Sequence, residues 1–168
     1  MIIITKIKDF EKFNVKLLSL INKTPKNPLI EFNDNITHTD FNLPKNFKRE
    51  YLDYFLEFIK PYLLEICAKL HTKKIEVSNA WFQQYTKNSL HQWHTHPNTH
   101  FTNVYFVELP FKSLGTEILN QDNLDLNEGD LLTFPAYYFH RSPINLSEKR
   151  KTIISFNSNI YDFNKNQI

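Results

Sequence analysis

Four of the seven histidines fall within ten residues: His91, His94, His96 and His100. On an extended strand the side chains alternate between two faces, so His94 and His96 would point the same way and Thr95 would face away from them. Two imidazoles side by side can chelate a transition metal. The pair is weak evidence by itself, because surface histidines in a polar loop would have the same spacing.

A further histidine, His140, follows a segment with strand character. Residues 128–140 begin with an acidic–glycine turn, continue as an apolar run and reach Pro135, which ends the strand before the histidine. An antiparallel β fold can bring this segment beside His94 and His96, which would place three ligands on one side of a metal and leave the other side open. The alternative for His140 is a core histidine satisfied by a hydrogen bond.

The elements that must position these histidines are short strands after residue 74. Aromatic and β-branched runs predict strands at 75–85, 102–109, 116–119, 130–134 and 152–161, separated by turn-like breaks. No helical pattern interrupts this series of strands, which indicates antiparallel β structure, and a jelly roll is the natural closed form of it.

The N-terminal part has a different pattern. Apolar residues at helical spacing predict helices over 7–22 and 47–70, the second divided or kinked at Pro61, with an extended connection between the two. We therefore expect a mainly β protein with N-terminal helices (α+β). Residues 1–168 would form a single domain, in which 1–72 is mostly helical support and 73–168 is the jelly-roll (double-stranded β-helix) core.

Composition and charge narrow the classes of function. With 20 basic and 18 acidic residues, the chain has no charge excess that would indicate binding to nucleic acid or to an anionic membrane. No apolar segment has the length of a signal peptide or a membrane helix. The one cysteine, Cys67, lies in an apolar helical stretch and cannot form an internal disulfide, so we expect a buried thiol in a cytoplasmic protein.

From Trp81 to Asn157, the sequence resembles the 2-oxoglutarate- and iron(II)-dependent oxygenases. The likeness is greatest to small bacterial and phage members whose first motif reads His-x-His-Pro, as residues 94–97 do here. In that superfamily a His-x-Asp/Glu motif gives two iron ligands and a distal histidine gives the third. The resemblance implies a jelly roll, iron(II) and 2-oxoglutarate as cofactors, and the metal ligands His94, His96 and His140.

The resemblance also implies residues that bind the cosubstrate. Beyond the distal histidine the family has an Arg-x-Ser/Thr pattern, whose arginine binds the far carboxylate of 2-oxoglutarate, and Arg150 and Thr152 stand at the matching spacing. Arginine offers a planar fork of donors that suits a carboxylate. Tyr85 and Tyr105 lie where tyrosines of similar enzymes hydrogen-bond the cosubstrate. The alternatives are a solvated charge for Arg150 and ordinary aromatic packing for the tyrosines.

The chain departs from the family at His96, which stands where the superfamily has its carboxylate ligand. An imidazole there leaves the site one unit more positive. Three interpretations stay open: a three-histidine centre, which iron(II) tolerates; a set completed by a more distant carboxylate such as Glu117; or a site that has lost oxygenase activity. On a regular strand His91 would face away from His94, so we interpret His91 and His100 as surface or substrate-pocket residues.

Three classes of function are consistent with these residues. The first is a 2-oxoglutarate/Fe(II)-dependent dioxygenase that hydroxylates a small molecule, a peptide or an amino-acid side chain. The second is a cupin-type metal-dependent dioxygenase or isomerase without 2-oxoglutarate, which would leave Arg150 and Thr152 without a role. The third is a non-enzymatic jelly-roll binding module, which predicts no metal. Substrate, reaction outcome and oligomeric state stay open, a homodimer being the commonest oligomer.

Overall fold

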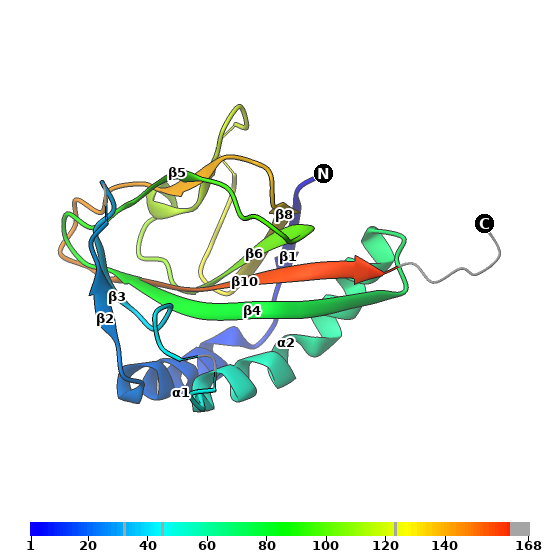
Figure 1. Ribbon diagram of the computed structural model, residues 1–168, viewed down its shortest axis with the longest axis horizontal. Coiled ribbons are helices and arrows are strands. Elements are labelled where there is room, and N and C mark those ends of the chain that lie inside the picture. The colour runs from blue at the N-terminus through cyan, green and yellow to red at the C-terminus, as the bar shows by residue number, and fades with distance from the viewer. Residues whose placement is uncertain (32, 45, 123, 162–168) are drawn as a thin grey trace.

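The computed structural model describes residues 1–31, 33–44, 46–122 and 124–161. Two helices and two β-sheets account for most of them (Figure 1). The helices are α1 (Phe10–Lys23) and α2 (Glu50–Lys69), with a short 3-10 helix at Lys112–Leu114. The strands are β1 (Ile3–Lys6), β2 (Asn27–Leu29), β3 (Ile36–Thr39), β4 (Lys74–Tyr85), β5 (His91–His94), β6 (Phe101–Glu108), β7 (Glu117–Ile118), β8 (Asp130–Pro135), β9 (His140–Ser142) and β10 (Lys151–Tyr161).

All strand pairs are antiparallel. The larger sheet has seven strands in the order β1-β8-β6-β10-β4-β3-β2, and the smaller has three in the order β5-β9-β7. The helices cover one face of the larger sheet, and the smaller sheet lies over the other (Figure 1). The molecule therefore has three layers, with the larger sheet in the middle.

Alternation along the central strand β10 divides its side chains between two cores. Ile154 and Phe156 point toward the helices, where Phe156 packs against Phe55 of α2 with ring centroids 5.9 Å apart. Ile153 points the other way, into the core between the sheets, with Phe106 of β6. Because β10 is buried on both faces, its register decides which side chains meet the helices and which meet the smaller sheet.

The expected fold class, mainly β with N-terminal helices, agrees with these elements, but residues 1–72 are not only helical support. β1, β2 and β3 belong to the larger sheet, where Ile3 lies opposite Thr133 and Thr39 lies opposite Gln83. The sequence pattern missed them because β1 is too short to show alternation and residues 27–39 lie in a stretch interrupted by proline and asparagine.

The predicted division of the second helix into two pieces at Pro61 is wrong, and the alternative, a kink there, stays a prediction. α2 runs through Pro61 as one helix, with the proline on its exposed side, where solvent can satisfy the carbonyl that loses its partner. Cys67 is buried as expected, and burial raises the pKa of its thiol. Neither α1 nor α2, the two α-helices of the described ranges, is long and apolar enough to cross a membrane.

The helix-facing core gives a first prediction. Phe55 is fully buried between Tyr105 and Phe156, so Phe55→Ala should lower the free energy of unfolding by about 3–5 kcal/mol through lost burial and a cavity. Val15 of α1 is 75% exposed, so the matched control Val15→Ala should stay within about 0.5 kcal/mol of the parent. Urea denaturation measures both, and equal effects of the two substitutions would contradict the proposed packing of α2.

Candidate metal centre

Three histidines converge between the sheets. His94, His96 and His140 each bring one ring nitrogen to a common region, and these nitrogens all lie within 4.8 Å of one another. Strand pairing accounts for two of them, because His94 ends β5 directly opposite His140 at the start of β9. His96 lies beyond β5, where its backbone N–H donates to the carbonyl of Ala136 at 3.0 Å. The predicted histidines are thus brought together, and their role as metal ligands stays a prediction.

Hydrogen bonds define which nitrogen each imidazole can offer. Nδ1 of His94 donates to the Gln92 carbonyl at 2.7 Å, and Nδ1 of His140 donates to the Tyr138 carbonyl at 3.0 Å. Nδ1 of His96 lies 2.6 Å from the side-chain amide oxygen of Asn157 on β10. Since these acceptors require the proton on Nδ1, Nε2 of each ring keeps its lone pair. Oxygen partners on one nitrogen and a free lone pair on the other are typical of metal-binding histidines.

Burial favours the neutral form of all three rings. It lowers the pKa of His94, and it lowers the pKa to about 4 for His96 and to about 3 for His140, with neighbouring imidazoles acting in the same direction on the last two. An imidazole must be deprotonated at the coordinating nitrogen to bind a metal. His96 and His140 are therefore ready to act as ligands well below neutral pH, and burial shifts the pKa of His94 in the same direction.

Glu117, the carboxylate considered as a completing ligand, is not part of this cluster. Its carboxylate accepts a hydrogen bond from Arg141 Nε at 2.7 Å, and the Arg141 guanidinium lies 4.7 Å from the centre of the Trp93 ring. Within the described ranges the triad contains imidazoles alone. The geometry therefore does not support Glu117 as a completing ligand, and the three-histidine centre stays a prediction.

His91 belongs to the site, contrary to its expected orientation. β5 carries an extra residue between His91 and His94 relative to β9, and this bulge turns both side chains to the same side. The His91 ring stacks on that of His94, with centroids 3.8 Å apart. Gln83 Nε2 lies 3.5 Å from its Nδ1 and Asp34 lies 3.6 Å from its Nε2. Burial, with the neighbouring imidazoles, lowers the His91 pKa to about 3, so the contact with Asp34 involves a neutral ring.

Three of the residues expected to bind a cosubstrate lie elsewhere. Arg150 forms a two-point ion pair with Glu108, at 2.8 and 3.1 Å, and the Thr152 hydroxyl donates to the same carboxylate. The Tyr105 hydroxyl donates to Asn14 of α1 at 2.7 Å, within the helix-facing core. The adjacent residues Ile153 of β10 and Phe106 of β6 point between the sheets. The side chains of Arg150, Thr152 and Tyr105 therefore do not reach the histidines.

Tyr85 does face the histidines, beside a residue that the sequence analysis missed. Lys151 is 1% exposed, its Nζ donates to Ser142 Oγ at 2.8 Å, and it lies 5.1 Å from the centre of the Tyr85 ring. Burial lowers the Lys151 pKa to about 7. The Tyr85 hydroxyl is buried near Ser142 but forms no hydrogen bond of normal geometry with the described residues, and burial raises its pKa.

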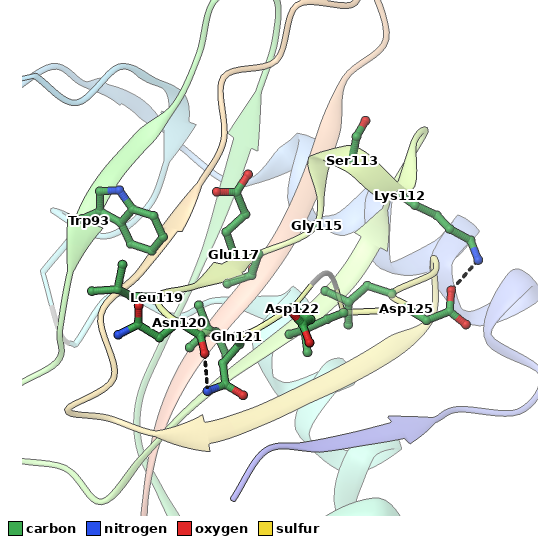
Figure 2. A pocket seen from close by; sticks show the side chains of 14 residues that line it. Trp93, Lys112, Ser113, Gly115, Glu117, Leu119, Asn120, Gln121, Asp122 and Asp125 are labelled. Carbon is green, nitrogen blue, oxygen red and sulfur yellow. Dashed lines mark hydrogen bonds and ion pairs between the residues drawn. The ribbon is translucent and has the colours of Figure 1, made fainter.

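The space beside the triad is small. The cavity bounded by the histidines, Tyr85, Ser142 and Trp81 has a volume of about 20 Å³, which is room for about one water molecule. A larger cavity of about 660 Å³ lies next to it, between β7 and residues 119–122 and 124–126. Figure 2 shows this groove with Trp93 at one end and the ion pair of Lys112 and Asp125 at the other. Thr116 lines both spaces.

Comparisons with solved structures show which known fold this protein shares. No family model and no curated protein sequence matches the chain. Among solved structures, an oxidoreductase of the 2OG-Fe(II) oxygenase family from Burkholderia pseudomallei superposes with a TM-score of 0.73 at 11% identity, over 94% of this chain and 85% of that one. The chain has the fold of the 2-oxoglutarate/Fe(II) oxygenases.

Two further structures share this oxygenase fold. The non-heme alpha ketoglutarate-dependent epimerase SnoN from nogalamycin biosynthesis gives a TM-score of 0.71 at 10% identity, over 96% of this chain and 77% of that one. A prolyl hydroxylase from Trichoplax adhaerens, in complex with a peptide fragment of hypoxia inducible factor, gives a TM-score of 0.67 at 14% identity, over 96% of this chain and 83% of that one. At these identities the likeness is one of fold.

The triad predicts a metal-binding phenotype. Metal-free protein should bind one equivalent of Co²⁺, a spectroscopic probe for histidine sites, and His140→Ala should weaken this binding at least tenfold because it removes one of three ligands. The control is His100→Ala, which alters a histidine outside the triad. Absorption titration measures both affinities, and equal affinities in the two variants would exclude the triad as the binding site.

The lowered pKa values predict sensitivity to acid in the metal-free protein. Between pH 6.5 and about 4, His91, His96 and His140 become protonated in the unfolded chain but stay neutral in the folded protein. The unfolded chain therefore binds more protons, and the free energy of unfolding falls as pH falls, by up to about 1.4 kcal/mol per pH unit for each histidine. Urea denaturation across this range should give a shallower slope for His140→Gln, and an unchanged slope would contradict the assignment.

Proposed function

We propose that the protein is a 2-oxoglutarate/Fe(II)-dependent dioxygenase with His94, His96 and His140 as its iron ligands. The observation that carries the proposal is the convergence of three neutral imidazoles, each with Nδ1 already hydrogen-bonded and Nε2 free. The shared oxygenase fold supports it, and we take the two facing sheets as a jelly roll. Three imidazoles and open positions beside them suit iron(II).

In this proposal Lys151, and not Arg150, binds the far carboxylate of 2-oxoglutarate. Arg150 is already neutralised by Glu108, whereas Lys151 forms no ion pair with a carboxylate among the described residues and is buried on the same side as the triad. A buried ammonium without a counter-ion is unfavourable, and a dicarboxylate would supply the missing charge. The free hydroxyl of Tyr85 would donate a second hydrogen bond to it.

The chain's own residues would bind and orient the cofactors. Iron(II) and 2-oxoglutarate, when bound, supply the oxidising chemistry, in which O₂ decarboxylates the oxo acid to succinate and CO₂ and leaves one oxygen atom for the substrate. Because the cavity beside the triad has room for about one water, the cosubstrate needs a change of rotamer in a lining side chain such as Gln83 or in Lys151. The buried walls around Trp81 would exclude bulk water.

We infer that the reaction is a hydroxylation and that the substrate is a small molecule or a peptide or amino-acid side chain. The adjoining groove of about 660 Å³ is within the usual size of such binding sites, and Thr116 connects it to the triad. The peptide complex of the similar prolyl hydroxylase is consistent with this class of substrate. A cytoplasmic protein of bacterial or phage origin, alone or as a homodimer, stays part of the same proposal.

A metal-dependent dioxygenase that does not use 2-oxoglutarate is the second candidate. Two observations favour it: the donor set lacks a carboxylate, and the cavity beside the triad is small. Such an enzyme would bind its substrate directly at the metal and would need no buried cation. The buried position of Lys151 is what favours the first candidate over it.

The deciding experiment is an anaerobic titration with iron(II) and 2-oxoglutarate, monitored by the visible absorption band of the chelated oxo acid. Lys151→Met should weaken 2-oxoglutarate binding roughly 10- to 100-fold, the effect of losing a charged hydrogen bond. The neighbouring Arg150→Ala is the matched control and should leave the band intact. Since Lys151 loses its proton near pH 7 in the free protein, 2-oxoglutarate affinity should fall as pH rises above 7.

Each other outcome favours a different conclusion. A band that depends on Arg150 and not on Lys151 would support the assignment made from sequence spacing. Metal binding without a band would support the second candidate. Without any metal binding, both candidates would fail and a non-enzymatic binding module would remain.

A further inference from the structure

Asn157 contacts one of the three converging histidines from the opposite sheet. It lies on β10, on the face that also carries Ser155 toward the triad, and its Oδ1 accepts the Nδ1–H of His96 at 2.6 Å. The two residues are 61 positions apart in the chain. This hydrogen bond therefore connects the loop that carries His96 to the central strand of the larger sheet.

The other two histidines of the triad do not need such a partner. His94 and His140 each donate Nδ1–H to the main-chain carbonyl two residues earlier, at 2.7 and 3.0 Å. Those carbonyls belong to the same local segment as the ring and are positioned with it. His96 lies beyond the end of β5 and uses a side-chain oxygen, so within the triad its orientation alone depends on a distant residue.

We propose that Asn157 is the positioning residue for His96, holding the proton on Nδ1 and directing Nε2 toward the other two histidines. An amide oxygen accepts a hydrogen bond without adding charge, so it orients the ring and leaves the site neutral. Trp81, whose ring centroid lies 5.7 Å from that of His96, limits the tilt of the same ring. The role of Asn157 in metal binding rests on the proposed function.

The hydrogen bond from His96 to Asn157 suits an imidazole at the position where the resembled oxygenases have a carboxylate ligand. A carboxylate ligand that had been replaced by chance would leave the new imidazole without a dedicated acceptor for its N–H. Here the acceptor is present, lies within a short hydrogen bond and comes from the central strand of the larger sheet. The third imidazole is thus supported as a ligand by a residue whose chemistry suits it.

The first test uses metal-free protein, so that it does not depend on the proposed function. Nitrogen-15 NMR at neutral pH should show the His96 proton on Nδ1 in the parent and in Asn157→Asp, which keeps the acceptor. In Asn157→Leu the preference should shift toward the Nε2–H form, which is usual for a free imidazole. Asn159→Leu is the matched control, because Asn159 Oδ1 accepts a backbone N–H of His100 and no ring nitrogen.

The second test measures Co²⁺ affinity in a double-mutant cycle. Asn157→Leu should weaken binding roughly 10- to 100-fold, whereas in the His96→Ala background the same change should have almost no effect, because Asn157 acts through His96. Asn157→Asp should retain the parental affinity or exceed it. If Asn157→Leu unfolds the protein, as judged by its melting curve, Asn157→Ala replaces it as a smaller substitution without the acceptor.

The two tests separate this inference from the proposed function. An unchanged His96 tautomer in Asn157→Leu overturns the positioning role, whatever the metal does. An equal loss of affinity with and without His96 also overturns it, since the effect would then be structural. A shifted tautomer in a protein that binds no metal would uphold the contact between Asn157 and His96 and would refute the metal centre.

Discussion

The alternation of side chains along β10 is the constraint on which both the core and the site depend. The strand pairs with β4 on one side and β6 on the other, and both of its faces are buried. One face packs on the helices through Ile154 and Phe156, and the other presents Lys151 and Asn157 to the space between the sheets. A slip of one residue would exchange these sets, placing apolar groups beside the triad and a lysine against α2.

The charge of the proposed centre follows from the same arrangement. Three neutral imidazoles do not offset the charge of a divalent metal, and Lys151 adds a buried cation within the same layer. A centre with a carboxylate ligand would be one unit less positive. The three-histidine centre therefore gains more from binding a dianion, because each charge on the ligand then meets an uncompensated positive group in a region of low polarity. This is a physical reason to expect a dicarboxylic cosubstrate with an imidazole in the third position.

Sequence reasoning anticipated which histidines lie together, because they are a few residues of one type at a fixed spacing, and their role as metal ligands stays a prediction. His94, His96 and His140 could be chosen because a paired and a distal histidine on antiparallel strands can meet. It did not identify Lys151, because Arg150 was chosen from the Arg-x-Thr spacing of the family, and in the structure Arg150 pairs with Glu108 while the next residue, Lys151, is buried on the side of the triad. It also failed for His91, because a bulge changes the alternation on which the inference relied.

The N-terminal strands were missed for a related reason. β1 and β3 are each four residues long and are recognisable mainly by their partners in the larger sheet. Long-range pairing decides such elements, whereas the sequence displays only local pattern. The helices, whose apolar residues recur over several turns, were predicted to within a few residues at each end.

Burial and hydrogen bonding act on the same imidazoles and together favour one state. Burial lowers the pKa of each ring and so removes its charge, while the acceptor at Nδ1 partly opposes that shift but holds the remaining proton away from Nε2. Charge and tautomer are thereby both suited to coordination before a metal arrives. The arrangement has a cost in the metal-free protein, since desolvated rings are unfavourable when their Nε2 lone pairs have no partner among the residues that the structure describes. Metal binding to the folded state would recover this free energy, because the unfolded chain has no such preformed set of ligands.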